Sequence, residues 1–244
     1  MSIQMNQGVL EKQTDMTGDG LAFEIHPFST LDGLMSYMLI NTALQQGVLI
    51  DPAMALLGDY LLFLDRQSIR LVASIDTHIH ADRASASRYL RQLCQSDFMM
   101  NHRSISTAVS VQVRDTEQMD VAGLPFQFMY TPGHAFDHQV LRVGNHLFTG
   151  DCLLLDRCGR TDLPGADLGD QFQSLKKFAS FSDTIHVYPS RQANGVYSMS
   201  MGEIRRKNTW LALSQEKFEE TMAAHCSNQP KPSDVDYYLT FNSR

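Results

Sequence analysis

Three segments of the chain carry residues that can bind a metal ion. The first reads Thr-His-Ile-His-Ala-Asp over residues 77–82 and follows an apolar run directly, so it is expected at the end of a strand. Imidazole is the commonest metal ligand in proteins, and His78 and His80 are close enough in sequence to point into one cleft. A chance pair of histidines in a polar loop is the alternative interpretation of this segment.

Two later segments repeat this arrangement. Thr-Pro-Gly-His over residues 131–134 follows an apolar run, and its proline and glycine favour a tight turn that presents His134. Phe-Thr-Gly-Asp over residues 148–151 places Asp151 after another strand in the same way. A single histidine in a turn is usually an ordinary surface residue. Three strand ends that each supply a potential ligand are more specific together, so the sequence predicts a metal site built from these three segments.

Strand-like and helix-like segments alternate along the chain and must position these ligands. Apolar residues at helical spacing predict helices over 54–68, 85–94, 172–181 and 203–225, the last with a break near Asn208. Short apolar runs bounded by Gly, Pro or Asn predict strands over 37–40, 47–50, 69–75, 106–113, 126–130, 139–143, 146–148 and 184–188. Groups of strands and helices interleave twice, which indicates a layered α/β architecture with helices outside packed sheets.

The composition is that of an ordinary globular protein. Of 244 residues, 43% are hydrophobic, and the formal net charge of −7 disfavours a nucleic-acid partner bound through its phosphates. No Cys-x-x-Cys pair, signal-peptide pattern or membrane span is found, so a cytoplasmic protein with reduced thiols and no membrane partner is expected. Residues 1–20 are expected as a loose arm, 21–226 as one catalytic domain and 227–244 as a polar C-terminal tail.

The order of these motifs resembles that of the metallo-β-lactamase superfamily. Thr-His-x-His-x-Asp, Thr-Pro-Gly-His and Gly-Asp occur in that order, and the resemblance extends roughly over residues 28–211. It implies an αββα sandwich, in which two mixed β-sheets are flanked by helices. The metal site is then expected at one edge of the sandwich, between the two sheets.

A narrower resemblance is to the persulfide dioxygenase branch of this superfamily. It rests on Gly-Asp-Cys-Leu-Leu at 150–154, Cys-Gly-Arg-Thr-Asp at 158–162, opening strands at 37–39 and 48–52, and Gly202-Glu203 followed by Asn208. It implies one Fe(II), with zinc as the alternative metal, on His78, His134 and Asp151, and His80 close by. Such a triad leaves positions for a substrate sulfur and O2 together.

The activity implied by this resemblance is oxidation of a low-molecular-weight thiol persulfide. Glutathione persulfide or a similar compound would react with O2 to give sulfite and the free thiol, and the resemblance leaves room for a homodimer. A mononuclear zinc hydrolase of thioesters or lactones, like glyoxalase II, is the alternative, with Asp82 as its general base. A non-catalytic binding protein on the same fold is disfavoured, because it need not retain all three ligands.

Two arginines depart from the superfamily pattern. Arg83 and Arg191 stand where its two-metal enzymes have histidines, and arginine has no lone pair with which to bind a cation. Either they place positive charge where a second metal would sit, or they fill a site that was already unused. We expect Arg83 to pair with Asp82, and Arg191 to bind a substrate carboxylate.

Several other side chains near these motifs have two interpretations each. Arg160 could bind a substrate carboxylate or sulfur oxyanion, or pair structurally with Asp162. Cys158 could be a redox sensor, but a buried packing thiol is the commoner role. His138 is close enough in sequence to His134 to line the cleft. The residues expected to act in catalysis are His80, Asp82 and Arg160.

Overall fold

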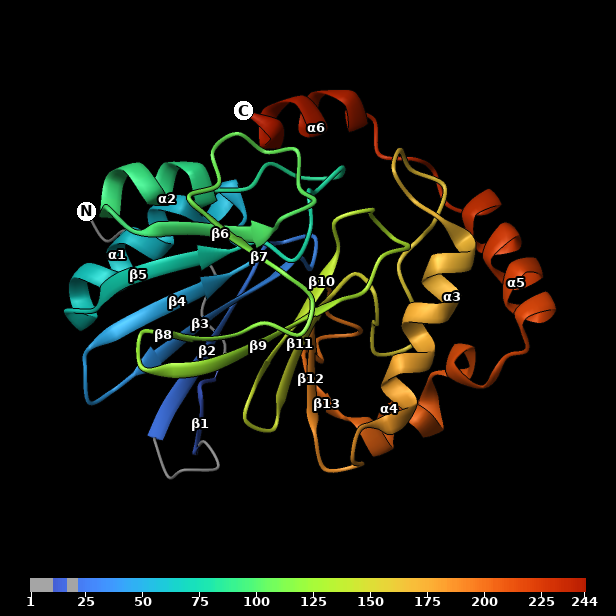
Figure 1. Ribbon diagram of the computed structural model, residues 1–244, viewed down its shortest axis with the longest axis horizontal. Coiled ribbons are helices and arrows are strands. Elements are labelled where there is room, and N and C mark those ends of the chain that lie inside the picture. Colours follow the sequence, from blue (N-terminus) through green and yellow to red (C-terminus); the bar gives the residue numbers. More distant parts are fainter. Residues whose placement is uncertain (1–10, 17–21) are drawn as a thin grey trace.

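The computed structural model describes residues 11–16 and 22–244, which form two β-sheets packed face to face (Figure 1). The first sheet has the strand order β1-β2-β3-β4-β5-β6-β7, and the second has the order β13-β12-β11-β10-β9-β8. Strands of the first sheet are β1 (Gln13–Met16), β2 (Ala22–Ser29), β3 (Met35–Asn41), β4 (Gln46–Ile50), β5 (Arg70–Ile75), β6 (Asp97–Asn101) and β7 (Val111–Val113). Strands of the second sheet are β8 (Gln118–Val121), β9 (Leu124–Tyr130), β10 (Gln139–Val143), β11 (His146–Gly150), β12 (His186–Pro189) and β13 (Met199–Ser200).

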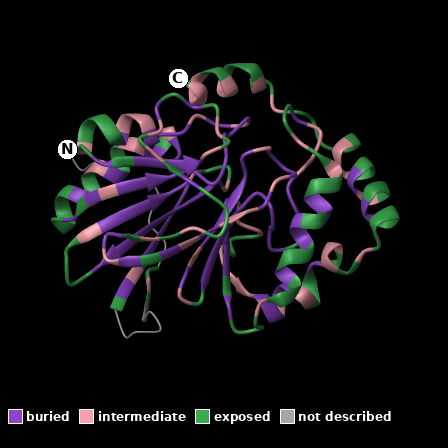
Figure 2. Cartoon of the chain, in the orientation of Figure 1, coloured by how far each residue is buried: buried purple, intermediate pink, exposed green. Residues whose placement is uncertain are grey.

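Both sheets are mixed, and their facing sides form the main core. In the first sheet β2, β3 and β4 pair antiparallel, whereas β4 to β7 are parallel. In the second sheet only β11 and β12 pair parallel among the described strands. Tyr37 and Ile50 from one sheet and Phe128 and Phe148 from the other are buried in the same cluster. The two sheets therefore share an apolar core, and most of their strands are coloured as buried in Figure 2.

Helices cover the outer faces of both sheets, as the αββα expectation requires. On the first sheet lie η1 (Met54–Leu56), α1 (Leu57–Gln67) and α2 (Ser87–Cys94), where Tyr60 and Leu90 are buried. On the second lie α3 (Leu168–Lys177), η2 (Phe178–Ser180), α4 (Met201–Lys207), η3 (Thr209–Ala212) and α5 (Gln215–Ser227). The last helix, α6 (Val235–Ser243), returns across the upper edge of the sandwich in Figure 1.

Most expected elements are present, and the differences are local. The expected helix over 203–225 divides into α4, η3 and α5 at the expected break, where the Asn208 side chain caps η3 at the Trp210 amide. Of the expected strand over 106–113 only β7 forms. The elements that were not predicted are β1, which lies in the expected loose arm, β2, β6, β8, β13 and α6. The N-terminal arm lies largely outside the described residues. Within the described part of the chain, no helix is both long and apolar enough to cross a membrane.

Candidate metal centre

The three predicted ligands lie together where three strands end. His78 follows β5, His134 follows β9 and Asp151 follows β11, and all three side chains are buried. One ligand atom from each lies within 4.8 Å of the other two. Asp151 Oδ2 lies 3.5 Å from His134 Nε2 and 3.8 Å from His78 Nε2. The structure therefore brings the three side chains to one point, with a donor set suited to a divalent transition metal.

Each histidine is oriented by its other ring nitrogen. His134 Nδ1 lies 2.8 Å from the carbonyl oxygen of Arg160, which can only accept, so Nδ1 carries the hydrogen and Nε2 keeps a lone pair. His78 Nδ1 lies 2.9 Å from the hydroxyl of Thr77, which is itself within 3.0 Å of both oxygens of Asp51. His78 Nε2 is buried and has no hydrogen-bond partner among the described residues, which fits a metal ligand.

The protonation states of the ligands also suit a metal ion. Burial and the neighbouring histidines hold the pKa of His78 well below its usual value, so the ring is neutral at physiological pH. Burial alone would raise the pKa of Asp151, but His134, a hydrogen bond from Ser190 and Arg83 outweigh it and lower the pKa. A neutral imidazole and an ionised carboxylate are the forms that coordinate metals.

Two glycines let the chain come this close to the ligands. Gly150 has φ +52°, and a Cβ there would lie 2.5 Å from Thr77 Oγ1 and 2.7 Å from His138 Nε2. A Cβ on Gly159 would lie 2.4 Å from the carbonyl oxygen of Asp151. The glycines of the Gly-Asp and Cys-Gly-Arg segments are therefore required by the packing around Asp151.

His80 lies beside the centre but faces away from it. Its Nε2 atom is 3.4 Å from Asp51 Oδ1 and 3.2 Å from Arg83 Nη2, and its ring centroid is 4.2 Å from that of His78. His80, Asp51 and Asp76 form a second group with ligand-like spacing, but Arg83 Nη2 lies 3.8 Å from Asp51 Oδ2 and already supplies a cation there. His80 is therefore placed to stabilise the loop rather than to join the three ligands.

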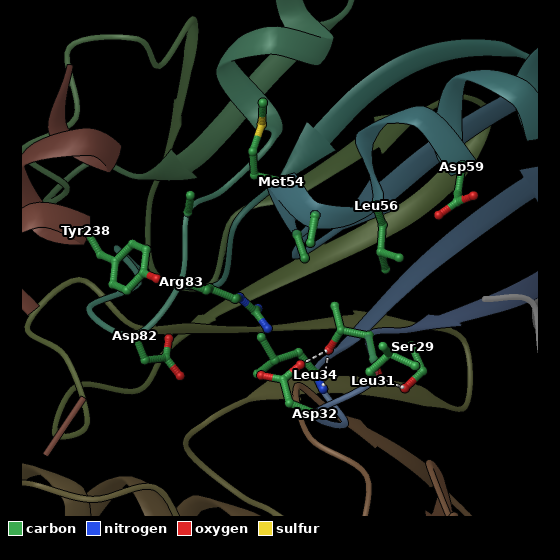
Figure 3. A pocket seen from close by; sticks show the side chains of 14 residues that line it. Ser29, Leu31, Asp32, Leu34, Met54, Leu56, Asp59, Asp82, Arg83 and Tyr238 are labelled. Carbon is green, nitrogen blue, oxygen red and sulfur yellow. Dashed lines mark hydrogen bonds between the residues drawn. The ribbon is translucent and has the colours of Figure 1, made fainter. Parts of the chain in front are cut away.

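Asp82 pairs with Arg191, so the expected pair with Arg83 is wrong. Arg191 Nη2 forms an ion pair with Asp82 Oδ2, and its Nε atom lies 3.5 Å from Asp151 Oδ1. The side chains of Asp82 and Arg83 diverge in Figure 3, where the chain bends at both residues. Arg83 is 5% exposed and is directed inward, to Asp51 and His80.

Arg160 forms the structural pair with Asp162 that the sequence suggested. Its Nε and Nη2 atoms lie 2.6 and 2.9 Å from the two carboxylate oxygens of Asp162, and its Nη1 donates to the carbonyl of Pro230 at 2.9 Å. The pairing lowers the pKa of Asp162 to about 2. A contact of Arg160 with a substrate stays a prediction.

A cavity of about 330 Å³ opens directly over the ligands. His134 and Asp151 line it together with Asp82, and residues 229–232 of the C-terminal segment form one wall. Its basic lining residues are Arg157, Arg160, Arg191, His225 and Lys231. A neighbouring cavity of about 470 Å³, shown in Figure 3, shares Asp82 and has an acidic rim at Asp32 and Asp59. The cavity next to the ligands is thus the one suited to an anionic compound.

Sequence reasoning missed Ser190 and Asn242, and it expected His138 only to line the cleft. Ser190 donates to Asp151 Oδ1 at 2.5 Å, and buried His138 accepts from the Cys152 amide at 3.2 Å through its Nε2 atom. The Asn242 amide group donates to the carbonyls of His80 and Arg83 at 2.8 Å each, and its oxygen accepts from the Ser85 amide at 2.9 Å. The segment 227–244, expected as a polar surface tail, thus braces the loop that carries the first motif. No local pattern marks Asn242, because its partners lie about 160 residues earlier.

Comparison with known proteins first defines the class. No protein-family model matches the chain. A metallo-β-lactamase from Staphylococcus aureus has the same fold, with a TM-score of 0.82 at 19% identity over 91% of this chain and 72% of that one. The chain therefore has the fold of this metallo-β-lactamase, with the buried histidines and aspartate at one edge.

Closer relatives define the branch. The crystal structure of ETHE1 from Myxococcus xanthus is 30% identical, covers 90% of this chain and 97% of that one, and superposes with a TM-score of 0.84. The human mitochondrial persulfide dioxygenase ETHE1 is 26% identical over 89% of this chain and 86% of its own length. The chain belongs to the persulfide dioxygenase branch of the metallo-β-lactamase superfamily.

Proposed function

We propose that this protein is an iron-dependent dioxygenase that oxidises a low-molecular-weight thiol persulfide, such as glutathione persulfide, with O2. The outer sulfur would leave as sulfite after taking oxygen from O2 and water, and the carrier would leave as the free thiol. The observation that supports this most is the convergence of His78, His134 and Asp151, with the buried Nε2 atom of His78 unpartnered, in a chain of this branch.

The proposed metal is a single Fe(II), with zinc as the alternative. Bound Fe(II) would supply adjacent open positions for a sulfur and O2. The residues of the chain hold the ligands in place. The Arg160 carbonyl and the Thr77 hydroxyl orient the two rings, and Ser190 fixes the Asp151 carboxylate. A site that is orientated before the substrate arrives needs little rearrangement when it reacts.

The cavity over the ligands is the proposed substrate site. Its basic wall would attract the carboxylates of a peptide-like carrier. Lys231 would be the most accessible of these cations, because its side chain is 64% exposed. Arg160 would shape this wall through its bonds to Asp162 and Pro230. Asp82 also lines the cavity, whereas His80 lies behind it and would act by positioning the loop.

The hydrolase alternative is weaker. It needs Asp82 as a free general base, but the carboxylate of Asp82 is already held by Arg191. Oxygen consumption and sulfite release, measured with glutathione persulfide on protein loaded anaerobically with Fe(II), test the main proposal. A zinc-loaded sample assayed with a glutathione thioester tests the alternative. Thioester hydrolysis without oxygen consumption on the persulfide would overturn the dioxygenase proposal.

Two further expectations remain proposals. A homodimer is tested by gel filtration with light scattering. A cytoplasmic location is tested by fractionation of cells that express the full chain. Neither affects the geometry of the metal centre.

A further inference from the structure

We infer that the cavity shown in Figure 3 binds the α-amino acid head group of the thiol carrier, with its ammonium at Asp32 and Asp59 and its carboxylate at Arg83. This head group is zwitterionic, and in a carrier such as glutathione it lies at the opposite end from the terminal carboxylate. The inference rests on the proposed function, because it names the carriers that the metal centre would accept.

The cavity has the size and the walls of a small-molecule site. Its volume of about 470 Å³ lies within the usual range for ligand pockets. Its lining comes from the loop between β2 and β3, from η1 and α1, from the loop after β5 and from α6. Leu34, Met54 and Tyr238 supply apolar surface from three of these elements. Such walls suit the methylene groups of a γ-glutamyl chain.

Charges of both signs line the cavity. Asp32 and Asp59 are exposed, and no salt bridge joins either to a basic side chain within the described residues. Arg83 lines the same cavity and is only 5% exposed. Arg83 would repel a simple cation, and the carboxylates would repel a simple anion. A group that carries both charges is therefore the ligand that suits this lining.

Arg83 has hydrogen-bond donors left for a ligand. Its Nη2 atom lies 3.2 Å from His80 Nε2 and 3.8 Å from Asp51 Oδ2. Its Nε atom is buried and has no hydrogen-bond partner in the part of the chain that the structure describes. In Figure 3 the side chain extends from its loop in among the other lining side chains. Because an unpaired buried donor is unfavourable, a carboxylate that enters the cavity would form a charge-assisted hydrogen bond with this guanidinium.

This acidic cavity adjoins the basic cavity over the metal ligands. Asp82 lines both cavities, and Arg191, which pairs with Asp82, lines the basic one. The Gln192 amide donates to the Gly33 carbonyl at 3.0 Å, and Leu34 forms a bridge with Arg191, so the backbone ties the two sides together. A carrier with its sulfur over the ligands can therefore place its terminal carboxylate against the basic wall, where Arg191 lies, and its zwitterionic head in the acidic cavity.

The test is calorimetric titration of the zinc-loaded protein with glutathione and with N-acetylglutathione. Acetylation removes the ammonium and leaves the thiol and both carboxylates unchanged. We expect the wild type to bind glutathione about fivefold more tightly, because two exposed carboxylates hold the ammonium. The variant Asp32→Asn/Asp59→Asn should lose this preference. Asp65→Asn should keep it and is the matched control, because Asp65 is also an exposed aspartate of α1 but does not line the cavity.

Arg83→Lys separates the two charges of the head group. Lysine keeps the positive charge but lacks the rigid set of donors that a guanidinium offers. We expect glutathione and N-acetylglutathione to lose affinity by the same factor, because both retain the α-carboxylate. The preference for glutathione should therefore remain in this variant. Circular dichroism checks that each variant is folded.

The outcomes separate this inference from the proposed function. Equal affinities of the wild type for the two thiols, or binding of neither, would show that the inference is wrong. A full preference for glutathione in the folded Asp32→Asn/Asp59→Asn variant would also overturn it. If the binding preference follows Asp32 and Asp59 but the Fe(II)-loaded protein consumes no O2 with glutathione persulfide, the head-group site stands and the dioxygenase proposal fails.

Discussion

The two oxygens of the Asp151 carboxylate face different groups, and each group can balance negative charge in a different way. On the histidine side, Asp151 Oδ2 faces His78 and His134, two rings whose Nε2 atoms are directed at one point. On the arginine side, Asp151 Oδ1 faces Arg191, which also binds Asp82. A cation on the first side can be exchanged, because the rings lose affinity for it when protonated. The cation on the second side is part of the chain and stays charged at any physiological pH.

This difference shows which side of Asp151 offers nitrogen donors for a metal ion. The carboxylate and the surrounding turns are common to both sides, and only the nitrogen donors differ. Imidazole nitrogens have a lone pair for a metal, whereas guanidinium nitrogens have none. The cavity opens onto both sides, because His134 and Arg191 both line it.

The largest effect is expected from His134→Ala, which breaks the histidine side. We expect bound metal to fall below detection and persulfide oxidation to fall by about a hundredfold or more, since even outer partners of metal ligands are worth roughly ten- to a hundredfold. The fold should survive, because His134 lies in a turn after β9 and outside the main core. Metal analysis with circular dichroism checks this. Full metal content in the variant would show that His134 is not a ligand.

Arg191→Ala should destabilise the arginine side by about 2 kcal/mol. Breaking a fully buried ion pair costs more free energy than this, but the Arg191 side chain is 33% exposed and solvent screens the pair. Urea unfolding in the presence of a chelator measures the effect without metal, and Arg191→Lys, which keeps the charge, should recover part of it. Equal unfolding midpoints for Arg191→Ala and wild type would mean that Asp82 and Asp151 do not need this cation.

Asn242→Ala should affect both sides, but more weakly. Three hydrogen bonds to the loop over residues 80–85 would be lost, and water can replace part of each at this half-buried position. We expect a loss of about 1 kcal/mol in stability and a several-fold loss of metal affinity, because the loop directly follows the proposed ligand His78. Metal competition with a chromogenic chelator measures the affinity. Asn242→Asp keeps an oxygen that can accept from the Ser85 amide. Its stability and metal affinity should lie between those of the wild type and Asn242→Ala.

The smallest effect concerns the cysteines beside the centre. Burial raises the pKa of the Cys152 thiol to about 12 and that of Cys158 further, so both stay protonated at pH 8 and react slowly. Cys94 and Cys226 are only partly buried, and a disulfide reagent should label them first. All four should react after unfolding. Labelling of Cys158 as fast as that of Cys226 would instead support a redox-sensing role.

The sequence by itself predicted the class of fold and the three side chains that converge at the edge of the sandwich. His78, His134 and Asp151 could be found because each follows an apolar strand, and the turns before His134 and Asp151 contain the glycines that such turns require. The alternating strands and helices predicted two packed layers in the same way. The unpredicted strand β6 (Asp97–Asn101) is short and mostly buried, so it lacks the alternation that marks a half-exposed strand.

Only the tertiary structure decided how charges pair around those ligands. Asp82 and Arg83 are adjacent in sequence, yet the partner of Asp82 is Arg191, 109 residues later. Asn242 likewise reaches its loop only because α6 returns across the edge of the sandwich. Turn chemistry and periodicity depend on neighbours along the chain. The direction of a side chain and the partner that it meets depend instead on how distant segments cross, and the packing of the two sheets sets that crossing.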